Sequence, residues 1–271
     1  AAIVGSPSVN NTEGKELWNT AYFLEEGQIK SQHHKSLLPT YDIFDENRYF
    51  EAGSNPRCIQ FQGQKIALTI CEDLWNVGTQ PKYKHSPMEE LIKEKPDLII
   101  NIAASPFSQH QAENRQEIFK LNAQKYKLPI YYVNHVGAQT ELIFDGGSCA
   151  VNENGERIEQ LPYFEESIQL VELSNHRETK TEKAPSKYER IEAALVLGIR
   201  DYFKKLNFEK ATLGLSGGID SALTLALAVK ALGKENVIPI LMPSQFSSDH
   251  SIDDSIELCK NLGCDHHIIE I

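Results

Sequence analysis

The stretch with the clearest potential for chemistry is a glycine-containing loop late in the chain. It lies between an apolar run over residues 211–215, which predicts a buried strand, and an Ala- and Leu-rich run over 222–232, which predicts a helix. Glycines at such a junction let the backbone approach an anion, and the first N–H groups of the helix point toward it. We therefore expect a phosphate-binding site made of Gly214, Leu215, Ser216, Gly217, Gly218, Ile219, Asp220 and Ser221.

Asp220 distinguishes this loop from the ATP-hydrolysing phosphate loop, which carries a lysine before its Ser or Thr. A carboxylate at a phosphate site would repel the ligand unless it holds Mg²⁺, so we expect Asp220 to be a magnesium ligand. The loop then suits a pyrophosphate that leaves ATP as a unit. Residues 216–221 resemble the Ser-Gly-Gly-x-Asp-Ser loop of the ATP pyrophosphatase family, which makes acyl-adenylates. The alternative is a glycine-rich turn without a ligand.

A second candidate is Cys71, which ends an apolar run over residues 65–70 and precedes Glu72. A cysteine at the end of a buried strand, just before a turn, has an exposed sulfur beside backbone N–H groups that could stabilise an oxyanion. Taken alone, such a residue is more often a buried structural cysteine, because cysteine packs as a small hydrophobe. The surrounding sequence is needed to decide between the two.

Residues 35–50 supply that context, since they bring a lysine, a tyrosine and a glutamate ahead of Cys71. Both segments together resemble the nitrilase superfamily, specifically the glutaminase domain of the glutamine-dependent NAD synthetase family. The resemblance implies that Cys71 is the nucleophile, Lys35 the catalytic lysine and Glu46 a supporting glutamate. It also implies that glutamine is bound by Tyr41, Glu72, Ser105 and Gln111.

Two features depart from that family pattern. A basic residue that grips the substrate is expected at the position of Gln111, and Arg115, one helical turn further on, is a possible substitute. The family's third catalytic residue, a glutamate that acts as general base, falls before Ala1. The pocket for the nicotinate side of deamido-NAD falls after Ile271. We therefore expect the chain to be an internal fragment of a longer protein.

The activity that the resemblance implies is that of a carbon–nitrogen ligase with glutamine as amido donor. Attack by Cys71 on glutamine would give a γ-glutamyl thioester and ammonia, with Lys35 and the backbone N–H near Glu72 stabilising the oxyanion. Deamido-NAD would react with ATP to form an adenylate, and ammonia would convert it into NAD and AMP. The resemblance further implies a homo-oligomer and an enclosed passage for ammonia.

Two other functions remain compatible with the residues. One is a nitrilase-type amidase fused to an ATP pyrophosphatase that acts on another acyl acceptor, because related loops serve several amidating enzymes. The other is a binding or scaffold protein with an inactive glutaminase half, which the missing glutamate and Gln111 would favour. A glutamate in the sequence upstream of Ala1 would favour catalysis, and its absence there would favour the scaffold.

Composition restricts the class of protein. The 27 Lys and Arg residues stand against 38 Asp and Glu, which gives a net charge of −11 and a pI near 5.3. Such a charge repels nucleic-acid backbones, so we expect no nucleic-acid partner. No apolar stretch of the sequence reaches membrane-spanning length, so we expect no membrane association. The five cysteines include no Cys-x-x-Cys pair, which favours free thiols in a reducing cytoplasm.

The elements that must position these residues predict an α/β domain over residues 1–175. Residues 1–5 predict a core strand, residues 98–103 a continuous apolar strand, and residues 111–126 a helix. The helix should pack through a face that includes Ala112, Ile118 and Leu121. Strands mixed with helices predict a layered α/β sandwich, and the resemblance makes it the α-β-β-α sandwich of nitrilases.

A charged stretch without large apolar residues, 176–187, predicts a linker to a second domain. In residues 188–271, helices predicted over 188–206 and 249–262 alternate with strands, the last of them over 266–271. This alternation predicts the start of a doubly wound parallel sheet, similar to that of adenine nucleotide α-hydrolases, with its ligand at the carboxyl ends of the strands.

Overall fold

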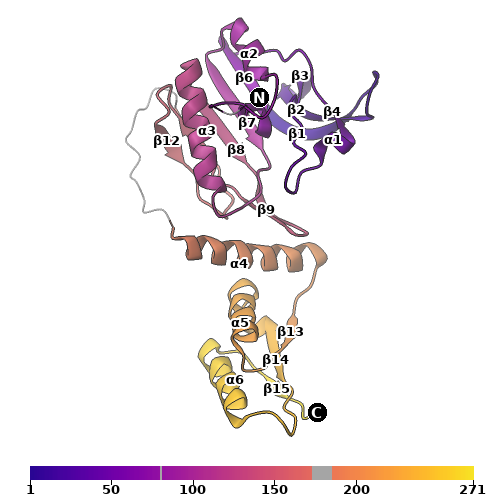
Figure 1. Cartoon of the computed structure of the whole chain (residues 1–271), viewed down its shortest axis with the longest axis vertical. Coiled ribbons are helices and arrows are strands. Elements are labelled where there is room, and N and C mark those ends of the chain that lie inside the picture. The colour runs from indigo at the N-terminus through magenta and orange to yellow at the C-terminus, as the bar shows by residue number, and fades with distance from the viewer. Residues whose placement is uncertain (80, 173–184) are drawn as a thin grey trace. The chain divides into compact units, whose positions relative to one another are not determined.

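The computed structural model describes residues 1–79, 81–172 and 185–271. The chain forms two compact units (Figure 1): unit 1 comprises Ala1–Val136 with Phe144–Glu182, and unit 2 comprises Gly137–Ile143 with Lys183–Ile271. Most of the predicted linker, residues 176–184, lies outside the described residues, as does the boundary predicted at residue 175.

The first sheet of unit 1 is antiparallel in the order β1-β2-β3, and a short strand, β4, pairs in parallel with β2. Its strands are β1 (Ala2–Val9), β2 (Leu17–Glu25), β3 (Gln28–His34) and β4 (Phe50–Glu51). The four-residue helix α1 (Glu46–Tyr49) comes directly before β4. The prediction of a core strand at residues 1–5 is wrong with respect to the core, because β1 is exposed along most of its length.

The second sheet of unit 1 has six strands in the order β12-β11-β8-β7-β6-β5. Its three central strands, β6, β7 and β8, run parallel to one another, so their carboxyl ends meet at one edge of the sheet. The bounds are β5 (Ile59–Phe61), β6 (Gln64–Ile70), β7 (Leu98–Ala103), β8 (Ile130–Asn134), β11 (Cys149–Val151) and β12 (Arg157–Gln160); a hairpin of β9 (Val136–Gln139) and β10 (Leu142–Asp145) precedes β11.

Two cores cover the two faces of this six-stranded sheet. One joins it to the first sheet, through residues such as Phe23 and Leu68. The other lies against the helices α2 (Pro87–Leu91) and α3 (Gln111–Tyr126) and the one-turn 3-10 segments η1 (Cys71–Leu74) and η2 (Ile92–Glu94). Figure 1 shows α3 running along the sheet. Layers of sheet, sheet and helix are thereby stacked on one another.

The limits predicted for helix α3 are confirmed, but its predicted packing face is wrong in part. Ile118 and Leu121 are only half-buried. Two polar residues of α3, Arg115 and Asn122, are buried instead, because hydrogen-bond partners for their side chains lie in the interior. The residues that α3 buries are Ala112, Arg115, Phe119, Asn122 and Ala123.

Unit 2 contains a parallel sheet in the order β13-β14-β15, as predicted. Its elements are α4 (Lys187–Leu206), β13 (Ala211–Gly214), α5 (Ile219–Leu232), η3 (Lys234–Asn236), β14 (Val237–Leu241), α6 (Asp249–Leu262) and β15 (His267–Ile268). The predicted last strand is therefore shorter than 266–271. Leu225 and Val237 are fully buried at the centre of this unit.

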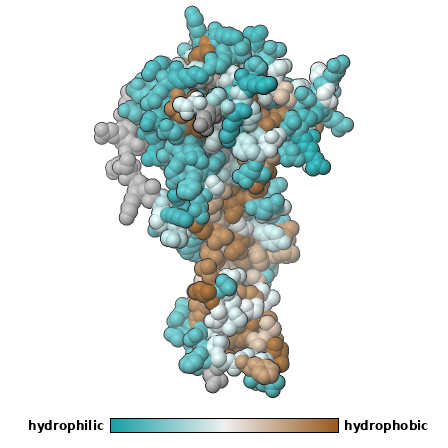
Figure 2. Space-filling view, viewed as in Figure 1, coloured by the Kyte–Doolittle hydropathy of each residue, from teal (hydrophilic) through white to brown (hydrophobic). Residues whose placement is uncertain are grey.

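The visible faces of the two units differ in character. Figure 2 shows mainly hydrophilic residues on the visible face of unit 1 and more hydrophobic residues at the surface of unit 2. Large apolar side chains exposed in unit 2 include Ile219 and Phe246. Within residues 1–79, 81–172 and 185–271, no helix has the length and apolar character needed to cross a membrane.

Candidate active site

Cys71 lies where the central strand β6 ends and the chain turns into η1. Its backbone has a φ of 42°, in the left-handed region that residues other than glycine rarely adopt. Such strain is often found at functional sites, where the surrounding structure holds a residue in an unfavourable conformation. The Asn101 side-chain amide donates to the Cys71 carbonyl oxygen at 3.3 Å and fixes this turn to strand β7.

Lys35 and Glu46 form an ion pair that acts on the Cys71 thiol. The Lys35 Nζ donates to Glu46 Oε1 at 2.6 Å, and the lysine side chain is almost completely buried. Burial raises the pKa of the Cys71 thiol to about 11, the Lys35 ammonium opposes that rise, and Glu72 and Glu46 add to it. The three residues that the family resemblance marks as catalytic are therefore close enough to influence one another electrostatically.

The fully buried side chain of Asp73 connects the segment that follows Lys35 to the turn at Cys71. Its Oδ1 accepts the backbone N–H groups of Ser36 and Leu37 at 3.0 and 2.9 Å, and its Oδ2 accepts that of Ile70 at 3.1 Å. A carboxylate that accepts several backbone donors is a strong anchor. No motif in the sequence singles out Asp73, although this residue stands two positions after the proposed nucleophile.

Glu72 is held by two tyrosines. The hydroxyl groups of Tyr41 and Tyr83 both donate to Glu72 Oε1, at 2.8 and 3.0 Å. Burial raises the pKa of the Glu72 carboxyl, and the two phenol hydrogen bonds oppose that rise. The Lys82 Nζ lies 3.9 Å from the centre of the Tyr41 ring, in a cation–π contact. Tyr41 and Glu72 are thus brought together, and Tyr83 is a member of the cluster that no sequence pattern selects.

Ser105 lies just beyond the end of β7, the parallel neighbour of β6. Its Oγ accepts hydrogen bonds from Gln111 Nε2 at 3.3 Å and from Arg115 Nη1 at 3.4 Å. Its backbone N–H donates to the side chain of Asn134, the last residue of β8, at 2.9 Å. The predicted residues Ser105 and Gln111 therefore meet at the carboxyl edge of the sheet on which Cys71 also lies.

Arg115 forms an ion pair with Asp145. Its Nη2 donates to Asp145 Oδ2 at 2.6 Å, and both side chains are buried. The buried Tyr132 phenol lies near enough to respond to both Arg115 and Cys71: its pKa is raised, mainly by burial, with Arg115 opposing and Cys71 adding to the rise. The suggestion that Arg115 substitutes for a free basic residue in the pocket is therefore not favoured by this geometry.

The glycine loop lies at the carboxyl end of β13, before the first turn of α5. Gly217 has a φ of 78°, and a Cβ there would lie 2.5 Å from the Ser251 carbonyl oxygen, so the chain requires glycine at this position. The Ser221 Oγ accepts from the Ser216 N–H at 3.2 Å and donates to the Gly218 carbonyl oxygen at 3.0 Å. The N-cap residue of α5, Gly218, has no side chain to satisfy the first N–H groups, which leaves them for an anion.

Asp220 is exposed in the first turn of α5. In the part of the chain that the structure describes, no group of three or more His, Cys, Asp or Glu side chains could hold a metal ion. Mg²⁺ in nucleotide sites is commonly bound by one or two carboxylates together with phosphates and waters. A single carboxylate therefore fits a magnesium ion that arrives with its nucleotide, and not a metal site closed by protein ligands.

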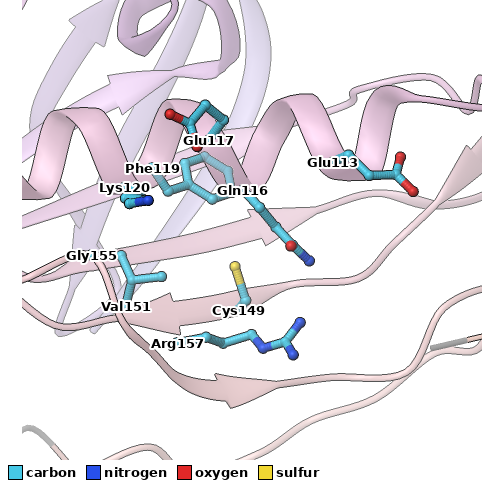
Figure 3. A pocket seen from close by; sticks show the side chains of 9 residues that line it. All are labelled: Glu113, Gln116, Glu117, Phe119, Lys120, Cys149, Val151, Gly155 and Arg157. Carbon is cyan, nitrogen blue, oxygen red and sulfur yellow. The ribbon is translucent and has the colours of Figure 1, made fainter. Parts of the chain in front are cut away.

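A hollow of about 330 Å³ lies elsewhere on unit 1, between α3 and the strands β11 and β12 (Figure 3). Its lining includes the thiol of Cys149 and the guanidinium of Arg157. Burial raises the pKa of the Cys149 thiol to about 12, with Arg115 and Arg157 opposing. The Lys35–Glu46 ion pair acts on Cys71, so we place the candidate active site there and not in this hollow.

Comparison with known protein families also divides the chain into an N-terminal part and a C-terminal part. Residues 1–183 match the family model for carbon-nitrogen hydrolases, and residues 191–271 match that for NAD synthase. The first match covers more than half of the sequence, so the chain belongs to the carbon-nitrogen hydrolase family. None of the five cysteines of the chain is in a disulfide.

The particular relatives are glutamine-dependent NAD(+) synthetases. The chain is 47% identical to that of Synechocystis sp. over 265 residues, which cover 95% of this chain and 48% of the relative. It is 36% identical to that of Thermotoga maritima, covering 95% of this chain and 50% of the relative. The chain spans about half the length of these curated relatives. The family resemblance inferred from the motifs is thereby confirmed.

Solved structures support the fold. A glutamine-dependent NAD+ synthetase from Acinetobacter baumannii, in complex with adenosine diphosphate, superposes with a TM-score of 0.89 at 33% identity, over 99% of this chain and 50% of that chain. A carbon-nitrogen hydrolase from Helicobacter pylori shares the fold over 60% of this chain, with a TM-score of 0.52. The predicted α/β fold class is confirmed.

Proposed function

We propose that this chain carries the glutaminase part and the nucleotide-binding part of a glutamine-dependent NAD synthetase. The observation that carries the proposal is the turn at the end of β6, where the ion pair between the buried Lys35 and Glu46 acts on the Cys71 thiol. The glycine loop before α5, whose N-cap Gly218 makes no side-chain cap hydrogen bond, supports a phosphate site in the same chain. The name of the relatives joins the same two functions.

In the glutaminase reaction, the Cys71 sulfur attacks the side-chain carbonyl carbon of glutamine, and the carbonyl oxygen becomes negatively charged. Lys35 and the backbone N–H groups of η1 stabilise this oxyanion; one such donor is worth about 3–4 kcal/mol. The carbon–nitrogen bond then breaks, the nitrogen takes the thiol proton, and ammonia leaves a γ-glutamyl thioester on Cys71. Water hydrolyses the thioester to glutamate and restores the thiol.

This reaction needs a group that accepts the thiol proton. A thiol with a pKa of about 11 is ionised in only about one molecule in 10⁴ at neutral pH. The Lys35 ammonium favours the thiolate but cannot take up a proton. The family resemblance assigns this role to a glutamate upstream of Ala1.

In the synthetase reaction, the carboxylate of deamido-NAD attacks ATP, forms an adenylate and releases pyrophosphate toward the loop over residues 214–221. The first N–H groups of α5 bind the phosphates, and Asp220 would hold a Mg²⁺ that neutralises part of their charge. Ammonia then displaces AMP and yields NAD. The adenosine diphosphate bound to the Acinetobacter baumannii relative supports an adenine nucleotide as the ligand.

The same proposal includes a homo-oligomer in a reducing, cytoplasmic environment. Five cysteines without a disulfide support the reducing environment. Light scattering on the purified full-length protein measures the oligomeric state, and a monomer would remove that part of the proposal.

The deciding experiment compares two amido donors in the full-length protein. Cys71→Ala should abolish NAD formation from glutamine and leave NAD formation from ammonia intact, because only the first reaction uses the thiol. Cys58→Ala is the matched control: Cys58 is also half-buried in unit 1 and its pKa is also raised to about 11, mainly by burial. If a folded Cys71→Ala protein loses both reactions equally, the proposal that the two reactions use separate sites is wrong.

A further inference from the structure

Two of the five cysteines, Cys259 and Cys264, meet at the end of helix α6. The helix ends at Gly263, whose φ of 69° lies in the left-handed region and whose N–H donates to the Lys260 carbonyl oxygen at 3.2 Å. The next N–H, that of Cys264, donates to the Cys259 carbonyl oxygen at 3.1 Å. These two bonds define a Schellman motif, in which the residues joined by the second bond commonly pack side chain against side chain. Both residues are cysteines here, so the motif brings two thiols together.

The backbone hydrogen bond also limits the separation of the two cysteines. With 3.1 Å between the Cys264 nitrogen and the Cys259 oxygen, standard bond lengths keep the two Cα atoms within about 7 Å even at full extension. Disulfides span Cα distances of about 4.4–6.8 Å. The Cys264 Sγ lies 3.8 Å from the Cys259 carbonyl oxygen, so its side chain points back toward α6. Burial raises the pKa of the Cys259 thiol, and the charge and a hydrogen bond of the Cys264 thiol add to that rise. The two sulfurs are therefore neighbours.

The two thiols differ in their distance from the surface. Cys259 is completely buried in the core of unit 2, whereas Cys264 is 7% exposed and stands between the exposed residues Gly263 and Asp265. Local opening costs least free energy at the ends of elements, where few buried contacts must be broken. Cys264 is therefore the thiol that a small solute reaches first, and Cys259 is the thiol that waits behind it.

We propose that Cys259 and Cys264 are a site of reversible oxidation by hydrogen peroxide, which joins them in a disulfide. The Cys264 thiolate attacks one oxygen of the peroxide, the O–O bond breaks, and hydroxide leaves with the proton of that thiol as water. The Cys259 sulfur then attacks the sulfenic sulfur, the S–O bond breaks, and the hydroxyl leaves with the Cys259 proton as a second water. The two thiols together lose two electrons, and the peroxide gains them. The inference does not depend on the proposed function.

The test treats the native full-length protein with hydrogen peroxide, blocks the remaining thiols with N-ethylmaleimide, and maps the tryptic peptides without reduction. Trypsin cleaves after Lys260, so it separates the two cysteines unless a disulfide joins their peptides. We expect a linked pair of peptides, lighter by two hydrogens than the two thiol peptides together, that disappears after treatment with dithiothreitol. Cys149, also 7% exposed, is the internal control and should occur in no linked peptide.

Two variants test the order of the steps. Cys259→Ser removes the second thiol, so Cys264 should stop at the sulfenic acid, which dimedone captures. Cys264→Ser should leave Cys259 a thiol at the same peroxide concentration, because Cys259 is closed off from solvent. If the unaltered protein gives no linked pair at a concentration that already oxidises the half-exposed Met242, or gives it only after unfolding in urea, the inference is overturned. Equal capture of Cys259 and Cys264 by dimedone in the two variants would overturn the assignment of Cys264 as the thiol that reacts first.

Discussion

The Nζ of Lys35 lies 2.6 Å from Oε1 of Glu46, and these two charges act on the Cys71 thiol in opposite directions. Because the thiolate is the reactive form, alkylation of Cys71 should rise about tenfold per pH unit until the pH reaches about 11. Lys35→Met should raise the pKa of Cys71 and slow alkylation at pH 9. Glu46→Gln should lower the pKa and accelerate it.

Iodoacetamide labelling followed by peptide mass spectrometry measures the rate at each cysteine separately. Cys58 is the internal control, because its pKa responds to Glu94 and Lys65 and not to the ion pair. A change of the Cys71 rate in the same direction in both variants would contradict the assignment of opposing electrostatic effects.

A second prediction concerns the phenol groups that hold Glu72. Both hydrogen bonds lower the pKa of this carboxyl, against the larger effect of burial. Tyr83→Phe removes one of them, so the carboxyl pKa should increase and the acidic limb of the kcat/KM profile for glutamine should move to higher pH. The control is Tyr126→Phe, since the Tyr126 hydroxyl donates to a surface carboxylate, Glu89, at 3.0 Å. An acidic limb that stays in place, or moves to lower pH, would refute the proposed effect.

The glycine loop gives a prediction about stability. Gly217→Ala places a Cβ in contact with the Ser251 backbone at a φ of 78°, so unit 2 should lose about 1–3 kcal/mol of unfolding free energy. Gly218→Ala is the matched control. Its φ is −84°, and the nearest atom to its Cβ would be Ser216 Oγ at 3.4 Å, an ordinary contact. Chemical denaturation of both variants decides, and equal losses would show that the close approach at Gly217 is not the cause.

The role proposed for Asp220 predicts that replacing it affects nucleotide binding in opposite directions with and without Mg²⁺. Calorimetry should show that Mg²⁺ strengthens the binding of adenosine diphosphate to the unaltered protein and has little effect on Asp220→Asn. Without Mg²⁺ the variant should bind at least as tightly, because a bare carboxylate repels phosphates. Asp254→Asn, an exposed carboxylate on α6, serves as control. An unchanged Mg²⁺ effect in Asp220→Asn would exclude the carboxylate as a metal ligand.

The parts of the site that could be predicted from the sequence are those written in consecutive residues. The strand before Cys71, the loop over 214–221 and the limits of α3 depend on local hydrophobic pattern and on glycine. The contacts that fix the cysteine turn join residues far apart in the sequence. Asp73 binds the N–H of Leu37, and no local pattern signals such a contact.

Burial of polar side chains is the second limit on prediction. Asn122 is buried because its amide donates to the Leu74 and Ile118 carbonyl oxygens, both at 2.8 Å. Arg115 is buried because Asp145 faces it. A pattern of apolar residues selects Ile118 and Leu121 for the core instead, since it contains no information about hydrogen-bond partners contributed by other elements.

Because the backbone of Cys71 is left-handed, stability and catalysis favour different residues at position 71. Holding a side chain in this conformation costs roughly 1–3 kcal/mol, whereas glycine adopts it without a steric penalty. A library of all substitutions at this position, selected only for resistance to proteolysis, should therefore be enriched in glycine. The same library selected for growth on glutamine as amide source should retain cysteine alone.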